Sequence, residues 1–224
     1  TRRLSSAASD VYKRQGIPVF SFDIQVSDEE AAKLVVSHIG SDNYQGGRLA
    51  GESMMRALGN KGSVAILSLP EVSSCILRVQ GFHDALEEAG SPIKIVTELS
   101  GKGSRDAGYT VATDILQAHP DINGIFAIND PSGLGAHAAV VKAGKEEQIT
   151  VVAFDASPAG KQGVFEKKLY DTPQQFPRKM AVGTVQAFVD YLAGNEVEKK
   201  VLIPCENYVH ETSVNDESRI AEQW

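Results

Sequence analysis

The most constraining feature of the sequence is a regular alternation of short apolar runs with helix-like segments. The runs GIPVFSFD (16–23), SVAILSL (63–69) and TVVAFD (150–155) have the length and composition of buried strands. Segments with apolar residues at helical spacing lie between them, such as SRDAGYTVATDILQAHP (104–120) and PRKMAVGTVQAFVDYLAG (177–194). This alternation predicts an α/β fold in which mostly parallel sheets are flanked by helices.

Two further segments allow more specific predictions of secondary structure. The acidic stretch that follows the first apolar run is predicted to be a loop. The helix that follows GIFAIND is predicted over 132–144, with small residues at its start.

Composition excludes several classes of protein. The 224 residues are 42% hydrophobic and 23% charged, enough to bury a core without disulfides or metals. The net charge of −7 argues against nucleic acid as the main partner, and no apolar run approaches the length of a membrane-spanning helix. Cys75 and Cys205 lie in separate segments without metal-ligand spacing, so we expect two partly buried thiols, no metal site and no cofactor.

The first fifteen residues, TRRLSSAASDVYKRQ, differ from the rest of the chain. They lack strand and helix periodicity, and they lack the apolar stretch of a secretory signal. A basic arm for nucleic acid or a membrane is one interpretation. We favour the other, a cloning or sequence-assembly scar, and therefore expect the ordered chain to start at Gly16.

Polar side chains stand at the ends of several predicted strands, namely Asp23, Asn129, Asp130 and Asp155. The carboxyl ends of parallel strands form the edge at which such sheets bind ligands. Asn and Asp also cap helices and form turns, so each has a purely structural alternative. We expect Asn129 to be a ligand group that can bond hydroxyls, and Asp130 to cap the next helix.

Arg78 and a glutamine pair are further candidates. Arg78 falls in SSCILRVQGF, near the start of a predicted helix, where it could pair with an acid such as Asp84. Near the ligand edge its planar guanidinium could instead hold a hydroxyl or a carboxylate. Gln174 and Gln175 precede Pro177, which suits a segment that crosses between domains.

No motif predicts catalysis. SGKGSRDAG (100–108) does not match the phosphate-binding loop G-x-x-x-x-G-K-[ST], and the histidines lack metal-ligand spacing. The serines lack a G-x-S-x-G elbow, and no pair of groups is placed as nucleophile and base. We therefore expect no catalytic residue, and an α/β enzyme is the less favoured reading.

Taken together, these stretches resemble the periplasmic sugar-binding proteins of bacterial ABC transporters, of the ribose-binding type. The matching stretches follow the family order from residue 16 to about residue 210: GIPVFSFD, VVSHIGSDNYQGGRLAGE, SSCILRVQGF, LQAHPDINGIFAINDPSGLGA, ITVVAFDASPAG and QQFPRKMA. The resemblance implies a non-catalytic receptor whose two α/β lobes close over a sugar or polyol. It also implies ABC permease subunits as partners, a periplasmic location and, when the protein is complete, a monomer.

The resemblance further implies which residues contact the ligand. Asp23 and Asp155 would accept hydrogen bonds from sugar hydroxyls, Arg78 and Asn129 would donate, and Leu69 would be an apolar contact. The implied set is Asp23, Ser41, Leu69, Arg78, Asn129, Asp155 and Gln175.

The same resemblance implies a division into lobes. The expected parts are a leader (1–15), a first lobe (16–40 with 176–204), a second lobe (41–175 with 205–212) and a tail (213–224). The family begins with further strands and helices, so we expect a fragment of a longer reading frame. Its first lobe would then be incomplete, with an exposed apolar face on its sheet.

Two departures from the ribose-binding pattern bear on the ligand. Ile24 stands where that pattern has an arginine, and Gly103 stands where it has an aromatic residue. Both changes favour another sugar, a polyol or a small polar solute over ribose. The effector domain of a lactose-repressor-type regulator is the alternative of the same fold. It requires a helix-turn-helix, which TRRLSSAASDVYKRQ is not.

Overall fold

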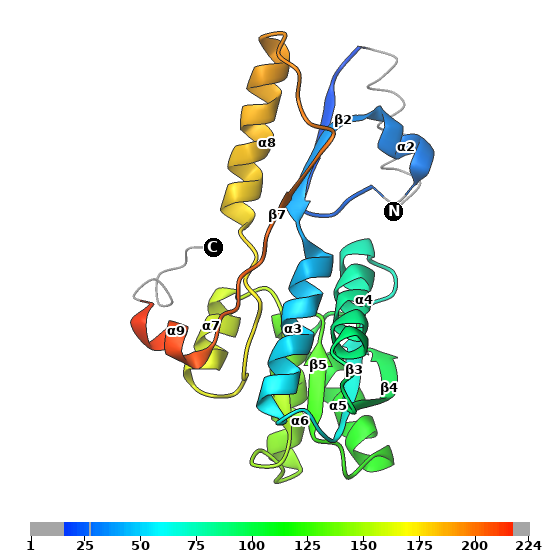
Figure 1. The fold of residues 1–224 in the computed structure, drawn as a ribbon, viewed down its shortest axis with the longest axis vertical. Helices are drawn as coiled ribbons and strands as arrows, with labels where there is room; N and C mark the ends of the chain where they lie inside the picture. The colour runs from blue at the N-terminus through cyan, green and yellow to red at the C-terminus, as the bar shows by residue number, and fades with distance from the viewer. Residues whose placement is uncertain (1–15, 27, 217–224) are drawn as a thin grey trace. The chain divides into compact units, whose positions relative to one another are not determined.

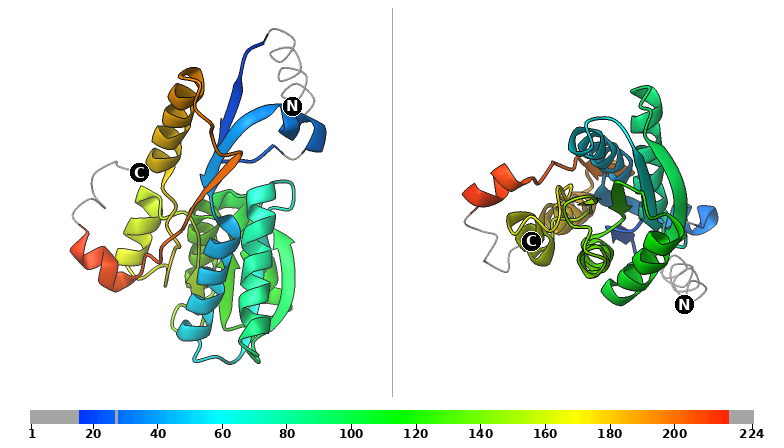
Figure 2. Two further views of the ribbon diagram at one scale, coloured as in Figure 1. Left: turned by 45° about the horizontal axis from the view of Figure 1, so that its top comes forward. Right: turned by 90° about the horizontal axis from the view of Figure 1, so that it is seen from below.

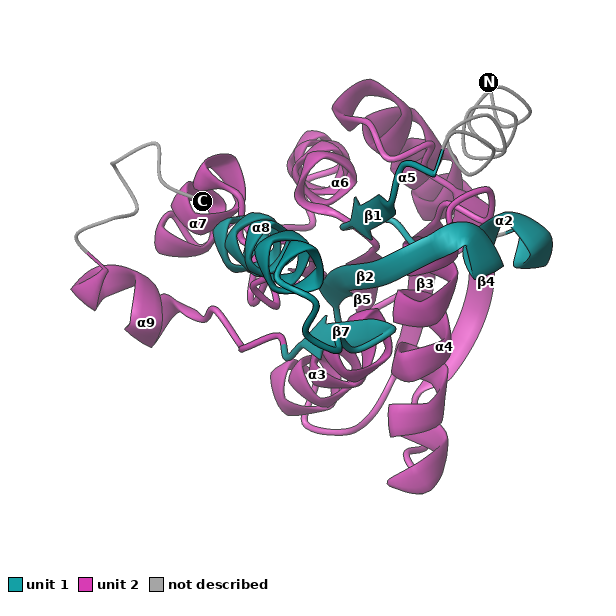
Figure 3. Cartoon of the chain, turned by 90° about the horizontal axis from the view of Figure 1, so that it is seen from above, with its two compact units in different colours: residues 1–42, 176–204 teal, residues 43–175, 205–224 magenta. Residues whose placement is uncertain are grey.

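The computed structural model describes residues 16–26 and 28–216, so the predictions for the leader and for the end of the tail lie outside it. The chain divides into two compact units, which Figure 3 draws in separate colours. Unit 1 holds residues 1–42 and 176–204, and unit 2 holds residues 43–175 and 205–224.

Unit 1 is built on a parallel sheet of strand order β1-β2-β7. Its strands are β1 (Val19–Phe22), β2 (Val35–Ser41) and β7 (Lys200–Ile203), and helix α8 (Pro177–Leu192) packs against β1 and β2. Pro177 is well tolerated in the first turn of α8. The amide hydrogen that proline lacks would have no hydrogen-bond partner there.

The acidic stretch after β1 contains a short helix, so its prediction as a loop was wrong. Helix α2 (Glu29–Leu34) runs directly into β2. Its N-cap is Asp28, whose side chain accepts a hydrogen bond from the Ala31 amide at 2.8 Å. The acidic residues that suggested a loop stand in the first turn of α2. Their negative charges there stabilise the helix by interacting with its dipole.

Exposed apolar side chains in unit 1 lie mainly on α8. Val182, Val185 and Leu192 are each more than 60% exposed, at 62%, 63% and 66%. The sequence predicts an exposed apolar face on the sheet of this unit. Phe22 of that sheet is 54% exposed, but most of the exposed apolar side chains lie on α8. A small sheet covers only one stripe of an amphipathic helix, and Met180 is the buried residue of α8.

Unit 2 contains a parallel sheet of strand order β4-β3-β5-β6 (Figure 1). Leu67 of β3 pairs with Ala127 of β5, and Phe126 of β5 pairs with Val152 of β6. The carboxyl ends of these strands therefore meet at one edge. The strands are β3 (Ser63–Ser68), β4 (Lys94–Ser100), β5 (Gly124–Ala127) and β6 (Thr150–Val152).

Helices cover both faces of this sheet because its central strands are apolar on both sides. Ile66 packs in a cluster with Met54 of α3 and Phe82 of α4, whereas Leu67 packs in a second cluster with Ile115 of α5. Helices α3 and α4 lie side by side, and so do α5 and α6 (Figures 1 and 2). The helices of unit 2 are α3 (Asn43–Ala57), α4 (Ser73–Glu88), α5 (Arg105–Ala118), α6 (Asp130–Lys142), α7 (Pro158–Phe165) and α9 (His210–Asn215).

The predicted α/β class with parallel sheets and flanking helices is confirmed. Cys75 and Cys205 are buried thiols that form no disulfide. Within residues 16–26 and 28–216, no helix is both long and apolar enough to cross a membrane.

Candidate ligand-binding site

Three of the predicted ligand residues meet at the carboxyl edge of the unit 2 sheet. Arg78 Nη1 and Gln175 Nε2 both donate to Asp155 Oδ1, each at 2.9 Å. Arg78 Nη1 also donates to the carbonyl oxygen of Ile128 at 2.7 Å, and its guanidinium carbon lies 3.8 Å from the centre of the Phe154 ring. This buried arginine is thus fixed by a carboxylate, a carbonyl and an aromatic face, which favours a defined geometry.

The acid that pairs with Arg78 is Asp155, not Asp84. Asp84 instead accepts a hydrogen bond from the Tyr44 hydroxyl at 2.8 Å. The partner of Arg78 lies 77 positions along the chain and on a different element. Proximity in sequence suggested the wrong acid, since the fold alone brings α4 and the end of β6 together.

Asn43 is a member of the cluster that the sequence reasoning missed. It is buried at the start of α3, and its Oδ1 accepts from Arg78 Nε at 2.8 Å. Asn43 follows an apolar strand closely, as Asn129 does. The same strand-end rule could therefore have found it, had β2 been extended to Ser41.

The prediction that Asp130 caps α6 was wrong, because Asn129 takes that position, whereas the ligand role of Asn129 stays a prediction. Asn129 is the N-cap of α6: its backbone is extended (φ −156°, ψ 164°), and its Oδ1 accepts from the Ser132 amide at 3.0 Å. Asp130 is the first helical residue, so α6 starts two residues earlier than predicted. An N-cap needs non-helical backbone, which Asp130 lacks, and its carboxylate is buried instead of turned back to the helix end.

Asn129 also lies beside Gly103 and the candidate Leu69. Its Nδ2 donates to the carbonyl oxygen of Gly103 at 3.0 Å. A Cβ on Gly103 would lie 3.3 Å from Leu69 Cδ2 and 3.2 Å from Asn129 Nδ2, so these three residues adjoin. Gly103 has φ +62°, a conformation that favours glycine over the aromatic residue of the ribose-binding pattern.

The remaining two predicted residues belong to unit 1. Asp23 follows β1 with φ +66°, and its amide donates to the carbonyl oxygen of Ile39 at 3.0 Å. Ser41 is the last residue of β2 and is buried, with its hydroxyl 3.7 Å from Met180 Sδ. Both therefore stand at the carboxyl ends of neighbouring parallel strands.

Asp130 is a fully buried carboxyl group with two donors. Its Oδ2 accepts from the Ser157 amide at 2.7 Å and its Oδ1 accepts from the Thr172 hydroxyl at 2.6 Å. Burial, and next the negative charge of Asp155, raise the pKa of Asp130 to about 7 against the opposing effect of these hydrogen bonds.

Asp130→Asn is expected to flatten the pH dependence of stability. Because the folded-state pKa of Asp130 lies above its unfolded value of 3.8, its stabilising contribution is full below that value and is lost as the pH rises through about 7. An asparagine could keep both contacts, with its oxygen accepting from Ser157 and its amide donating to Thr172, but it does not titrate. Urea unfolding of both proteins at several pH values should show the wild type losing stability relative to the variant as the pH rises. If the free energies of unfolding of the two proteins changed in parallel with pH, the raised pKa of Asp130 would be contradicted.

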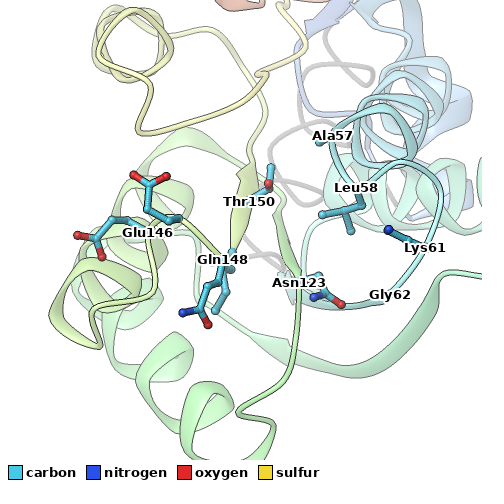
Figure 4. Close-up of a pocket in the computed structure, with 10 residues that line it drawn as sticks. Ala57, Leu58, Lys61, Gly62, Asn123, Glu146, Gln148 and Thr150 are labelled. Carbon is cyan, nitrogen blue, oxygen red and sulfur yellow. The ribbon is translucent and has the colours of Figure 1, made fainter.

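A cavity at the opposite edge of the unit 2 sheet lacks the features of the predicted site. It has a volume of about 420 Å³ and is lined by the loop after α3 and the starts of β5 and β6. Figure 4 shows Lys61, Asn123, Glu146 and Gln148 around it, and none of the predicted ligand residues lines it. Ligands of parallel α/β sheets bind at the carboxyl ends of the strands, so the Arg78–Asp155 edge stays the predicted site.

The chemistry available at that edge is hydrogen bonding. Arg78, Asn43, Asn129 and Gln175 offer amide or guanidinium groups, and Asp155 offers carboxylate oxygens. In the part of the chain that the structure describes, no cluster of three His, Cys, Asp or Glu residues could hold a metal ion.

The protein therefore combines an α/β fold with a cluster of polar side chains at the strand ends. Residues 4–196 match the sequence model of the periplasmic binding protein domain, and the chain belongs to that family. The predicted resemblance is thereby confirmed.

Curated relatives are import binding proteins. The chain is 34% identical over 196 residues to the D-apiose import binding protein of Paraburkholderia graminis, covering 86% of this chain and 61% of the relative. It is 32% identical over 200 residues to the ribose import binding protein RbsB of Bacillus subtilis, covering 89% and 63%. The chain therefore spans somewhat less than two thirds of the length of these relatives.

Solved structures show the same fold. An ABC transporter periplasmic solute binding protein from Actinobacillus succinogenes with bound D-allose superposes with a TM-score of 0.87 at 30% identity, covering 94% of this chain and 76% of that one. A solute binding protein from Agrobacterium vitis with bound D-fucose gives 0.85 at 26% identity, covering 97% and 74%.

Proposed function

We propose that this chain is the solute-binding receptor, or the larger part of one, of an ABC-type importer for a sugar or polyol. The observation that carries the proposal is the buried cluster of Arg78, Asp155 and Gln175 at the carboxyl edge of the unit 2 sheet. The names of the relatives, which are binding proteins for import of ribose and apiose, support the same class of ligand.

The cluster suits hydroxyl-rich ligands for a physical reason. A sugar hydroxyl donates one hydrogen bond and accepts others, so it needs acceptors and donors side by side. Asp155 supplies the acceptor, and Arg78 and Asn129 supply donors. Leu69 adds apolar surface beside Asn129. We further propose that Asp23 and Ser41 of unit 1 contribute hydrogen bonds to the same ligand.

The wider role follows from the class of protein. We propose ABC permease subunits as partners, a periplasmic location, a monomeric state for the complete protein and no chemical turnover. The net charge of −7 supports a partner other than nucleic acid. The relatives support the transport role over that of a repressor effector domain.

The ligand need not be ribose. A glycine at position 103, beside Leu69 and Asn129, takes up little space at the site. Ile24, which is 52% exposed, carries no charge to offer a hydroxyl. We therefore include hexoses and a cyclic polyol among the candidates.

Thermal unfolding with D-ribose, D-allose, D-apiose, D-fucose and myo-inositol tests the proposal. A compound that binds only the folded protein at 100 times its Kd stabilises it by about 2.7 kcal/mol and so raises the Tm. Asp155→Asn should weaken binding of that compound about tenfold or more, a change of about 1.4 kcal/mol, because a carboxylate acceptor becomes a neutral amide.

Gln148→Ala is the matched control, since Gln148 lines the cavity at the opposite edge of the same sheet. It should leave the Tm shift unchanged. If none of the five compounds raises the Tm of the wild type, or if Gln148→Ala abolishes the shift and Asp155→Asn does not, the proposed function or its site is wrong.

A further inference from the structure

The turn that carries Asp155 has an uncommon backbone conformation. Asp155 has φ +114° and the next residue, Ala156, has φ +52°. Residues with a Cβ rarely adopt positive φ, and two in succession are rarer because each side chain crowds its own backbone. Such a conformation persists only where the surrounding structure holds it.

Two buried side chains hold the backbone directly after Asp155. The Ala156 amide donates to Thr172 Oγ1 at 3.1 Å, and the Thr172 hydroxyl donates to Asp130 Oδ1 at 2.6 Å. The Ser157 amide donates to Asp130 Oδ2 at 2.7 Å. Consecutive amides of the turn are therefore anchored to one carboxylate, the first through Thr172 and the second directly.

The space around this carboxylate is closed. Asp130 and Thr172 are both 0% exposed, so neither is placed to touch a solute from outside. A Cβ on Gly160 would lie 2.0 Å from Asp130 Oδ2, so glycine is needed for α7 to approach the carboxylate. Asp130 is the first residue of α6, and Ser157 is the N-cap of α7. The carboxylate thus joins the starts of two helices to the turn between them.

The backbone of this turn fixes the position of the Asp155 carboxylate in the proposed ligand site. The Asp155 amide donates to the carbonyl oxygen of Pro173 at 3.0 Å, and the Gln175 amide donates to the carbonyl oxygen of Asp155 at 3.2 Å. These bonds hold the backbone at Asp155, and the bonds to Thr172 and Asp130 hold the backbone at Ala156 and Ser157. With both sides fixed, the Asp155 carboxylate stays at 2.9 Å from Arg78 and from Gln175.

We propose that Asp130 and Thr172 are positioning residues that hold the Asp155–Ala156 turn in its left-handed conformation, and that sugar affinity depends on them although neither contacts the sugar. The second half of this inference rests on the proposed function, whereas the first half concerns the turn alone.

Two measurements on the full chain separate these halves. Amide hydrogen exchange at Ala156 and Ser157, followed by NMR, reports on the turn without any ligand. Calorimetric titration with D-ribose, D-allose and D-apiose reports on affinity. Thr172→Val keeps the volume of the side chain and removes the hydroxyl, and Thr172→Ser restores the hydroxyl.

Thr172→Val is expected to speed exchange at Ala156 about tenfold or more and to weaken sugar binding about tenfold, which is 1.4 kcal/mol. Thr172→Ser should recover both values. Asp130→Leu should expose the Ser157 amide to exchange, whereas Asp130→Asn should protect it. Ile115→Val, which trims a buried side chain of α5 in the core of the same unit, controls for lost stability and should change neither readout.

The exchange rates and the sugar affinities test the two halves of the inference separately. Exchange at Ala156 that is no faster in Thr172→Val than in Ile115→Val overturns the positioning role, whatever the sugar data show. Faster exchange with unchanged affinity overturns the link to binding. If the wild type binds none of the sugars, the proposed function and the affinity half fail together, and the exchange data still decide whether Asp130 and Thr172 hold the turn.

Discussion

Replacing Arg78 by alanine is expected to lower the free energy of unfolding by about 3–5 kcal/mol, because it leaves a largely buried carboxylate without its cation. The side chains of Arg78 and Asp155 are only 6% and 13% exposed, so water compensates only in part for the lost guanidinium. The substitution also removes the donors to Asn43 and to the carbonyl of Ile128. Urea unfolding of the wild type and the variant at neutral pH gives the difference.

The matched control is Arg48→Ala. Arg48 forms an ion pair of similar length with Glu88, at 2.7 Å, but the two side chains are 28% and 61% exposed. Exposed pairs contribute about 0–1 kcal/mol, so this variant should be close to the wild type. Equal losses in the two variants would mean that Arg78 stabilises the protein as an ordinary surface ion pair does.

Gly47→Ala is the second substitution with a large expected effect, because it separates the two helices that carry the site. A Cβ on Gly47 of α3 would lie 2.1 Å from the carbonyl oxygen of Arg78 in α4. The obstacle is backbone, so no side-chain rotation relieves it and α4 must move. Overpacking of this kind costs about 1–3 kcal/mol, more than the gain of up to about 1 kcal/mol in helix propensity.

Gly183→Ala makes the same change where there is room. Gly183 lies inside α8, and a Cβ there would meet Ile39 at 3.5 Å, an ordinary contact. This variant should gain up to about 1 kcal/mol from helix propensity. If close packing of α3 on α4 requires glycine at position 47, thermal unfolding should show a lower Tm for Gly47→Ala and a higher Tm for Gly183→Ala than for the wild type. A Gly47→Ala protein as stable as the wild type would show that α3 and α4 can separate at little cost.

The fold class could be predicted because both faces of the unit 2 sheet are apolar. Strands such as SVAILS are hydrophobic without alternation, which indicates cover on both sides and hence parallel strands with helices between them. Helices α4, α5 and α8 also follow from apolar spacing together with Pro or Gly at their ends. Helix α2 could not be found this way, because six residues are too few for a periodic pattern.

The site could be predicted only in part, because its geometry depends on contacts between distant segments. Strand-end polarity pointed to Asn129 and Asp155, but it could not show that Arg78 would pair with Asp155 across 77 positions. It also could not distinguish Asn129 from Asp130 as the cap, since both residue types serve that purpose. The anchoring of Ala156 by Thr172 joins two loops and leaves no sequence pattern.

An NMR titration that maps binding onto the chain tests the central claim most directly. Isotope-labelled protein would be titrated with D-ribose, D-allose and D-apiose while backbone amide shifts are followed. We predict saturable shifts at the carboxyl edge of the unit 2 sheet, at Gly103, Asn129, Asp155, Ala156 and Gln175. Shifts confined to the cavity at the opposite edge, at Gly62, Asn123 and Thr150, or no saturable shift with any of the sugars, would contradict the account.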